Sequence, residues 1–488
     1  MSVVFSWDDS LGEGRAPLAR ASGAGVGGND RAPPERRTSR LPQRYVGLIW
    51  LMSCCEPALA AEVSHKAHGP VITAMLACVC GITLVLAVYC IRHYVFTLNR
   101  LFAAQRHPYI DVDTADWPTL TVFIAAHNEE AVIKDALTAL LNADYPRSKL
   151  QITPVNDRST DNTEVIVDQF VARYPLRLLP FHRRSGKPGK AAALKDAMAY
   201  VHSEVIIVFD ADYVPSRGLL KQLVAPLFDP EVGAVMGRVV PCNADTNLLT
   251  RLLDLERSGG YQVDQQARMN LGLVPQYGGT VGSVRVSALQ CVGGWHDDVL
   301  AEDTDLTYRL LLAGWKIAYQ NRSECYEEVP EAWAVRVKQI MRWTKGHNQV
   351  LVRHGRKIIS NPFLTPMEKA DAILLLGVYA VAPLVIIGWV LSIGLYFFDA
   401  LPFGSGILVA FAFFAYSTVG NFAAFFEIAA AVRMDRNRGR IRLLPLNFLG
   451  FLTSVVSISR ATLNQLFWDR WSKGGLQWDK TVRYRKAT

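Results

Sequence analysis

Three Asp-x-Asp triplets occur in the sequence. They occupy residues 111–113, 210–212 and 303–305. Two carboxylates at this spacing can hold a hard divalent cation, Mg²⁺ or Mn²⁺, and leave coordination sites open for the oxygens of a diphosphate. The second triplet directly follows the apolar segment 205–209, which is typical of a buried strand, whereas the first lies in a polar linker and the third opens a helical pattern. We therefore expect metal and diphosphate chemistry at Asp210 and Asp212.

A second acidic pair, Glu302 and Asp303, lies between the glycine-rich stretch 278–282 and an amphipathic helical pattern. Acids at the amino end of a helix stabilise its dipole, so helix capping is one interpretation of the pair. The other interpretation is catalytic, because an attacking hydroxyl group must lose its proton and a positioned carboxylate can take it.

Gln339, Arg342 and Trp343 are three and four residues apart on a predicted helix and therefore share one face. One interpretation is an ordinary amphipathic helix anchored by a tryptophan. The other is a binding surface, in which Arg342 pairs with a phosphate through two hydrogen bonds and Trp343 offers a flat apolar ring to a sugar.

The elements that must position these groups lie between residues 108 and 360, where short apolar strands alternate with helical stretches. This alternation predicts an α/β domain, a Rossmann-like, doubly wound and mostly parallel sheet. Ligands of such sheets bind at the carboxyl ends of the strands. Polar clusters follow three of the predicted strands, at 126–129, 156–158 and 210–212.

Half of the residues are hydrophobic, and they are concentrated in runs at 71–91, 371–398 and 406–432. Each run is long enough to cross a hydrocarbon layer about 30 Å thick, so we expect transmembrane helices rather than buried core helices. A fourth run, 443–467, contains Arg460 and is predicted to span the membrane, to re-enter it or to lie at its surface. Arginines cluster beside the runs, which places the segment 108–360 in the cytosol.

The two ends of the chain carry weaker signals. Residues 1–44 lack periodicity and are expected to be disordered, 45–70 is a signal-like or first membrane segment, and 468–488 is a basic, aromatic tail. The net charge of +8 comes largely from arginines beside the apolar runs, a distribution that favours lipid headgroups and argues against nucleic acid as a partner.

Taken in order, these motifs resemble those of the inverting family 2 glycosyltransferases with a GT-A fold, and more narrowly those of the membrane-integrated, processive synthases of cellulose, hyaluronan, chitin, poly-N-acetylglucosamine and mannan. The resemblance covers residues 108–360 and the membrane segments on both sides. It implies Asp303, beside Glu302, as the catalytic base, and Asp212, assisted by Asp210, as the metal ligand. The remaining residues that it implies are Ala126, Asn128, Glu129, Asp157, Lys190 and Asp210 for the donor, and Gln339, Arg342 and Trp343 for the diphosphate and the acceptor.

Three positions depart from the family pattern. Ala301 replaces the usual threonine before the Glu-Asp pair, Asn156 replaces the first of two acids in the uracil loop, and Lys195 replaces an asparagine. None of the three removes a catalytic group, but they leave the identity of donor and acceptor open.

The resemblance implies a multi-pass enzyme of the inner or plasma membrane that transfers sugar from a nucleotide-sugar donor, with uridine favoured by Asp157, to a β-linked polysaccharide coupled to export. Its partners would be the donor, a glycan or lipid acceptor, membrane lipids and an accessory export subunit. Two alternatives remain: a non-processive enzyme of the same fold that glycosylates a membrane lipid, and a non-enzymatic transporter or scaffold that keeps the fold without the chemistry.

Overall fold

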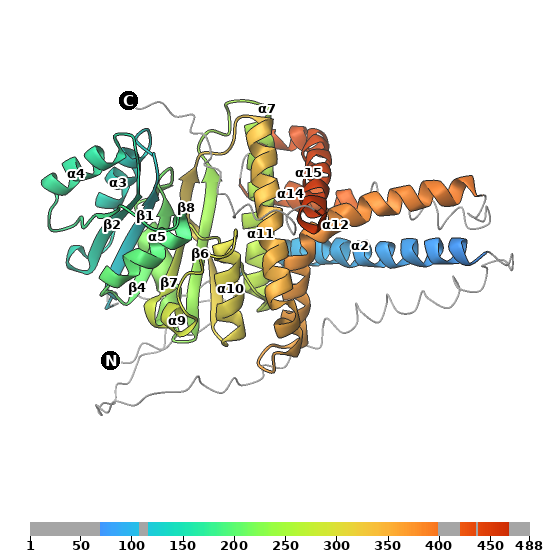
Figure 1. The fold of residues 1–488 in the computed structure, drawn as a ribbon, viewed down its shortest axis with the longest axis horizontal. Helices are drawn as coiled ribbons and strands as arrows, with labels where there is room; N and C mark the ends of the chain where they lie inside the picture. Colours follow the sequence, from blue (N-terminus) through green and yellow to red (C-terminus); the bar gives the residue numbers. More distant parts are fainter. Residues whose placement is uncertain (1–68, 107–115, 399–419, 436–437, 468–488) are drawn as a thin grey trace.

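A computed structural model describes residues 69–106, 116–398, 420–435 and 438–467 of the chain (Figure 1). The predicted tails 1–44 and 468–488 lie outside these residues, as do nearly all of 45–70 and the first half of the run 406–432.

One eight-stranded sheet forms the centre of the domain, in the order β3-β2-β1-β4-β7-β6-β8-β5. The first four of these strands are mutually parallel, with Ala126 at the end of β1 opposite Asn156 of β2. The strands are β1 Leu120–Ala126, β2 Leu150–Asp157, β3 Phe181–Arg183, β4 Val205–Asp210, β5 Val214–Pro215, β6 Val232–Pro241, β7 Gly282–Arg285 and β8 Lys316–Glu327.

The sheet is mixed: four of its seven strand pairings are parallel, in line with the prediction of a mostly parallel sheet, and three are antiparallel. β7 runs antiparallel to both of its neighbours, β4 and β6, and β5 runs antiparallel to β8. The pairing of β6 with β8 is parallel again. Hydrophobic periodicity indicates that a strand exists but carries no information on its direction, and β7 and β5 are only four and two residues long.

Helices cover both faces of the sheet, as the doubly wound pattern predicted. On one face, Ile133 and Leu137 of α3 pack with Ile124 of β1, and on the other, Leu194 of α5 packs with Phe123. Strands covered on both sides must be apolar throughout, which explains why Val205 to Phe209 are all buried. These covering helices are α3 Ile133–Leu141, α4 Thr163–Arg173, α5 Lys190–Ala197, α6 Leu219–Val224, α9 Val286–Cys291 and α10 Glu302–Leu312.

A second helical layer separates the sheet from the apolar helices (Figure 1). It contains the long helix α11 and a continuous helical segment whose middle part is a π-helix. A π-turn inside a helix is rare and is frequently found at functional sites. The elements are α7 Leu248–Ser258, the π-helix η5 Gly259–Gln265, α8 Gln266–Leu271 and α11 Trp333–Ser360.

Three helical segments in the described part of the chain are long and apolar enough to cross a membrane: Pro70–Phe102, Pro366–Phe397 and Gly439–Phe467. The first two, α2 and α12, lie side by side and project together from the domain (Figure 1). The third, made of η8 (Arg438–Leu446) and α15 (Asn447–Phe467), lies across their direction, next to α14 (Gly420–Met434) and α11. Asn348 of α11 donates to Gln465 of α15 at 3.0 Å.

Candidate active site

A cavity of about 1040 Å³ opens at the carboxyl ends of β1, β2 and β4, the edge at which a doubly wound sheet binds its ligands. Of the residues predicted from the sequence, all but Asn128 line it: Ala126, Glu129, Asp157, Lys190, Asp210, Asp212, Glu302, Asp303, Gln339, Arg342 and Trp343. The structure therefore brings together motifs that are more than 200 positions apart in the sequence.

Asn128 ties two strand ends together. It has a left-handed backbone, with φ of 56°, and its side-chain oxygen accepts a hydrogen bond from the Thr160 amide at 2.6 Å. Its own amide donates to Ser159 Oγ at 2.9 Å. These contacts join the turn after β1 to the turn after β2, and donor binding by Asn128 stays a prediction.

Asp157, at the end of β2, is a buried carboxylate surrounded by donors. It accepts hydrogen bonds from Arg158 Nε at 2.9 Å, Arg183 Nη1 at 3.0 Å and the Gly189 amide at 3.1 Å. Burial by itself would raise the pKa of Asp157, but these hydrogen bonds outweigh it and hold the pKa below its usual value. Asp157 therefore stays ionised, which leaves it able to accept hydrogen bonds from a ligand.

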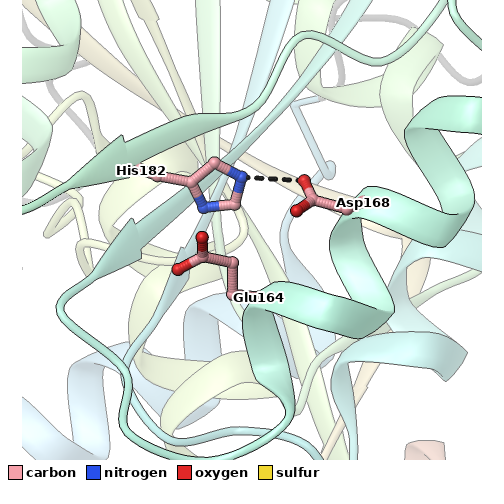
Figure 2. A group of neighbouring side chains, drawn as sticks. All are labelled: Glu164, Asp168 and His182. Atoms are coloured by element: carbon pink, nitrogen blue, oxygen red, sulfur yellow. Dashed lines mark hydrogen bonds and ion pairs between the residues drawn. The ribbon is translucent and has the colours of Figure 1, made fainter.

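Glu164, Asp168 and His182 form a cluster of neighbouring side chains (Figure 2), which contacts Asn156. His182 contacts Asp168 through Nε2 at 3.1 Å and the Asn156 side-chain amide through Nδ1 at 3.1 Å. The carboxylate of Glu164 is held through both oxygens by Arg184. With these ligand atoms already in protein contacts, we interpret the cluster as a support for the β2–β3 edge rather than as a metal site.

Lys190 opens α5 and crosses the cavity to the Asp-x-Asp motif. Its ammonium group donates to Asp210 Oδ1 at 2.5 Å and to the Gly279 carbonyl at 2.8 Å. Burial would lower the pKa of Lys190, but the carboxylates of Asp210, Glu302 and Asp303 raise it above its usual value. The lysine is therefore a fixed positive charge between the two acidic pairs.

Asp212 lies two residues after Asp210, in the turn that follows β4, and is almost fully buried, with 3% of its surface exposed. Next to it, the Tyr213 hydroxyl donates to Glu327 Oε2 at 2.7 Å. Asp210, Asp212 and Glu327 thus concentrate negative charge at one end of the cavity, and burial together with these carboxylates raises the pKa of the Tyr213 hydroxyl. Such a concentration of hard oxygen ligands fits a divalent cation.

Glu302 and Asp303 open α10 and face the same cavity. Asp303 Oδ1 accepts a hydrogen bond from the Thr304 amide at 2.6 Å within the first turn of α10, and Asp303 also lines the cavity. Burial and the neighbouring Asp303 raise the pKa of Glu302 to about 7. A pKa of Glu302 near neutrality makes the total charge of the Glu302–Asp303 pair depend on pH in the physiological range.

The glycine-rich stretch presses against this pair. Gly279 has a left-handed φ of 69°, and a Cβ atom on it would lie 2.8 Å from Asp303 Cβ. From the other side, α11 approaches just as closely, because a Cβ on Gly346 would lie 2.6 Å from Ala301 Cβ. Glycine at both positions lets the backbone hold Asp303 in place.

Several cavity residues were not predicted from the sequence. Arg257 of α7 and Glu327 of β8 form an ion pair at 2.6 Å, and Leu375 and Tyr379 bring α12 into the wall. His347 of α11 contacts the Trp343 carbonyl through Nδ1 at 3.0 Å, and burial lowers its pKa. None of these belongs to a motif; His347, one helical turn after Trp343, is the one that helical spacing could have indicated.

Comparison with known proteins agrees with this geometry. Residues 118–346 match the model of the family described as "Glycosyltransferase like family 2". The solved mannosyltransferase PcManGT from Pyrobaculum calidifontis, a complex with GDP-Man and Mn²⁺, superposes with a TM-score of 0.54 at 22% identity, covering 74% of this chain and 98% of that one. The matched segment is therefore similar to family 2 glycosyltransferases, and its structure has the GT-A fold.

Two curated relatives are similar over this same part of the chain. A probable glycosyltransferase, YdaM, of Bacillus subtilis is 34% identical over 264 residues, which are 54% of this chain and 61% of the relative. A beta-monoglucosyldiacylglycerol synthase of Synechocystis is 31% identical over 252 residues, 52% of each chain. The chain thus spans little more than half the length of these relatives.

Proposed function

We propose that the chain is an inverting glycosyltransferase that moves a sugar from a nucleoside-diphosphate donor, with UDP as the favoured nucleotide, to a hydroxyl group presented at a membrane surface. The observation that carries this proposal is that the Glu302–Asp303 pair lines the same cavity as Asp210, Asp212 and Lys190. A proton acceptor and a diphosphate site in one cavity are the two parts that direct sugar transfer needs.

In the proposed reaction the ionised Asp157 accepts hydrogen bonds from the base of the donor. Asp210 and Asp212 would hold a divalent cation, Mg²⁺ or Mn²⁺, which supplies positive charge for the diphosphate. Lys190, which lies against Asp210, and Arg342 add charge on the same side.

The acid pair carries out the transfer step. Asp303, beside Glu302, takes the proton of the acceptor hydroxyl while that oxygen forms a bond to the anomeric carbon. The bond from this carbon to the diphosphate oxygen breaks on the opposite face, and the nucleoside diphosphate leaves with the electron pair. A single displacement of this kind inverts the configuration at the anomeric carbon.

For the acceptor we propose a membrane lipid with a free hydroxyl group, of the diacylglycerol class. The Synechocystis relative is a synthase of a glucosylated diacylglycerol. In this chain the cavity wall includes Leu375 and Tyr379 of α12, four residues apart on the helix that projects beside α2. An acceptor that arrives along α12 would reach Trp343 and then Asp303 without leaving the membrane surface.

A growing β-linked polysaccharide coupled to export is the second candidate. It is favoured by the Gln339-x-x-Arg342-Trp343 motif, whose three residues line the same cavity. A saccharide end stacked on Trp343 would occupy the position that we assign to the lipid headgroup, and an accessory export subunit would then be a further partner.

We further propose that α2 and α12 cross the membrane, that α15 lies at its surface, and that the domain containing β1 to β8 is cytosolic. α15 lies across the two projecting helices (Figure 1) and exposes Leu449, Leu452, Val456 and Leu463, which recur on one helical face. Asn447, Ser457 and Ser459 are buried on the protein side. A helix with an apolar outer face and basic neighbours in η8 suits a lipid surface.

The test is sugar transfer by the full chain in detergent micelles containing dioleoylglycerol, with labelled UDP-glucose, UDP-N-acetylglucosamine and GDP-mannose offered separately. We expect a labelled product that extracts into organic solvent, requires Mg²⁺ or Mn²⁺, and disappears with EDTA or in Asp303→Asn. Asp298→Asn, which changes an exposed acid, is the matched control. A labelled product that stays in the aqueous polymer fraction would favour the polysaccharide, and full activity of Asp303→Asn would contradict the mechanism.

A further inference from the structure

The ring of Trp343 is flanked by two arginines from different helices. The guanidinium carbon of Arg257, on α7, lies 5.5 Å from the ring centroid, and that of Arg336, on α11, lies 5.2 Å from it. A guanidinium within about 6 Å of an indole centroid is attracted by the charge distribution of the ring. The position of the indole therefore depends on both arginines.

Each arginine is paired with a glutamate from another element. Arg336 Nη2 donates to Glu256 Oε1 of α7 at 2.5 Å, and Arg257 Nε donates to Glu327 Oε1 of β8 at 2.6 Å. Glu256, Arg257 and Glu327 line the cavity, whereas Arg336 does not and keeps only 6% of its side chain exposed. Arg336 thus acts from behind the cavity wall, where a ligand does not touch it.

Arg336 also determines how Gln339 faces the cavity. Its Nη1 donates to Gln339 Oε1 at 2.8 Å. A guanidinium has donors only, so it can hold the carbonyl oxygen of the amide but not its nitrogen. The Gln339 amino group, with two N–H donors, is therefore the part of the side chain that remains for a ligand.

We propose that Arg336 is the positioning residue of the acceptor half of this site, because it fixes both the Trp343 ring and the orientation of the Gln339 amide. The ligand group recognised there is an oxygen with free lone pairs, a hydroxyl or ether oxygen, placed against an apolar ring. This inference rests on the proposed function. It adds that acceptor affinity, rather than donor affinity, depends on a residue that never contacts the acceptor.

The experiment compares Michaelis constants for acceptor and donor in three variants of the full chain, with dioleoylglycerol in mixed micelles as the acceptor probe. Arg336→Lys keeps the charge but loses the planar fork that reaches Glu256, Gln339 and the ring together. Arg336→Met removes the charge, and Gln339→Glu keeps an oxygen for Arg336 but removes the amino donor. Arg353→Lys is the control, since Arg353 lies on the same helix and pairs with the exposed Asp298.

In Arg336→Lys and Gln339→Glu we expect the acceptor KM to rise roughly tenfold to a hundredfold, the range for one lost hydrogen bond to a charged or strictly oriented group. The donor KM should stay within about twofold, and Arg353→Lys should match the parent chain. In Arg336→Met the acceptor KM should rise further still, again with little change in the donor KM. If Arg336→Met fails to fold, as judged by its thermal unfolding, the other two variants decide.

Two results would overturn the inference. One is an unchanged acceptor KM in both Arg336→Lys and Gln339→Glu, and the other is an equal rise of the donor and acceptor constants, which a general loss of structure would produce. A parent chain that transfers sugar from none of the donors would instead contradict the proposed function, so the two failures are distinguishable.

Discussion

The raised pKa of Glu302 predicts a specific pH dependence of sugar transfer. Burial and the adjacent Asp303 bring the pKa of Glu302 to about 7, compared with 4.5 for an ordinary glutamate. A group with that pKa is ionised to about 9% at pH 6 and about 91% at pH 8. When Glu302 is protonated, the acid pair carries one negative charge fewer and attracts the acceptor proton less strongly. We therefore expect kcat/KM of the parent chain to rise about tenfold between these two pH values.

Glu302→Gln removes the titrating group while keeping its size. In this variant the rise of kcat/KM near pH 7 should disappear, leaving a profile that is flat between about pH 6 and pH 8 at a lower rate. Asp303→Asn, by contrast, should lose transfer across the whole range because the proton acceptor itself is gone. The assay is the initial rate of labelled sugar transfer at subsaturating donor, measured in buffers of constant ionic strength.

The same pKa shift has a consequence for stability. Because the folded chain binds the Glu302 proton more tightly than the unfolded chain, this group lowers the free energy of unfolding as the pH rises from about 4.5 to about 7, and the loss is complete above pH 7. Glu302→Gln should therefore unfold at a higher temperature than the parent at pH 8, with the difference shrinking below pH 5. A Glu302→Gln variant whose kcat/KM still rises near pH 7, or whose melting temperature at pH 8 equals that of the parent, would refute the assignment of this pKa to Glu302.

Two further predictions concern packing around the site. Gly346→Ala should lower the melting temperature and reduce sugar transfer, because its new Cβ would lie 2.6 Å from Ala301 Cβ. Helix α11 must then move away from the acid pair, at a cost of about 1–3 kcal/mol. Thermal unfolding measures the loss of stability, and kcat measures the loss of transfer. Asp371→Asn should destabilise the chain by about 3–5 kcal/mol, because Arg268, which is 1% exposed, loses one of its charged partners where α12 meets α8. The melting temperature measures this loss of stability.

Matched variants control for both changes. Gly355→Ala lies on the same helix as Gly346, but its Cβ would meet Leu351 at 3.5 Å, an ordinary contact, so it should be neutral or stabilising. Asp298→Asn removes an acid that is 60% exposed and should cost less than about 1 kcal/mol. Equal effects of Gly346→Ala and Gly355→Ala would show that α11 has room to move at Ala301, and equal effects of the two aspartate changes would show that burial at Arg268 carries no penalty.

Local sequence was sufficient for the parts of the site that follow a strand or share a helical turn. Asp210 and Asp212 follow a continuous apolar strand, and Arg342 and Trp343 share a helical face with Gln339, so periodicity predicted the elements that carry them, while the family resemblance implied their roles. The same periodicity predicted helices on both faces of the sheet. It also predicted the long helices α2 and α12, since length and apolar composition are properties of a segment by itself.

The direction of β7 and the contacts across the cavity were decided by tertiary structure. β7 has four residues and no alternation that could indicate whether it runs parallel or antiparallel to β4. Arg336 read in isolation is one more basic residue on an amphipathic helix. It becomes a positioning residue because Glu256, some 80 positions earlier, is brought against it.

The carboxylates of the site show which properties follow from the sequence and which from the tertiary structure. Their order and spacing predicted a metal site at one acidic pair, and the family resemblance implied a proton acceptor at the other. The pKa of Glu302 near 7 and the ion pair of Lys190 with Asp210 exist only because folding removes these charges from water and sets them a few ångströms apart. A sequence specifies which groups can ionise, whereas burial and the distances between charges, which belong to the fold, determine how they do so.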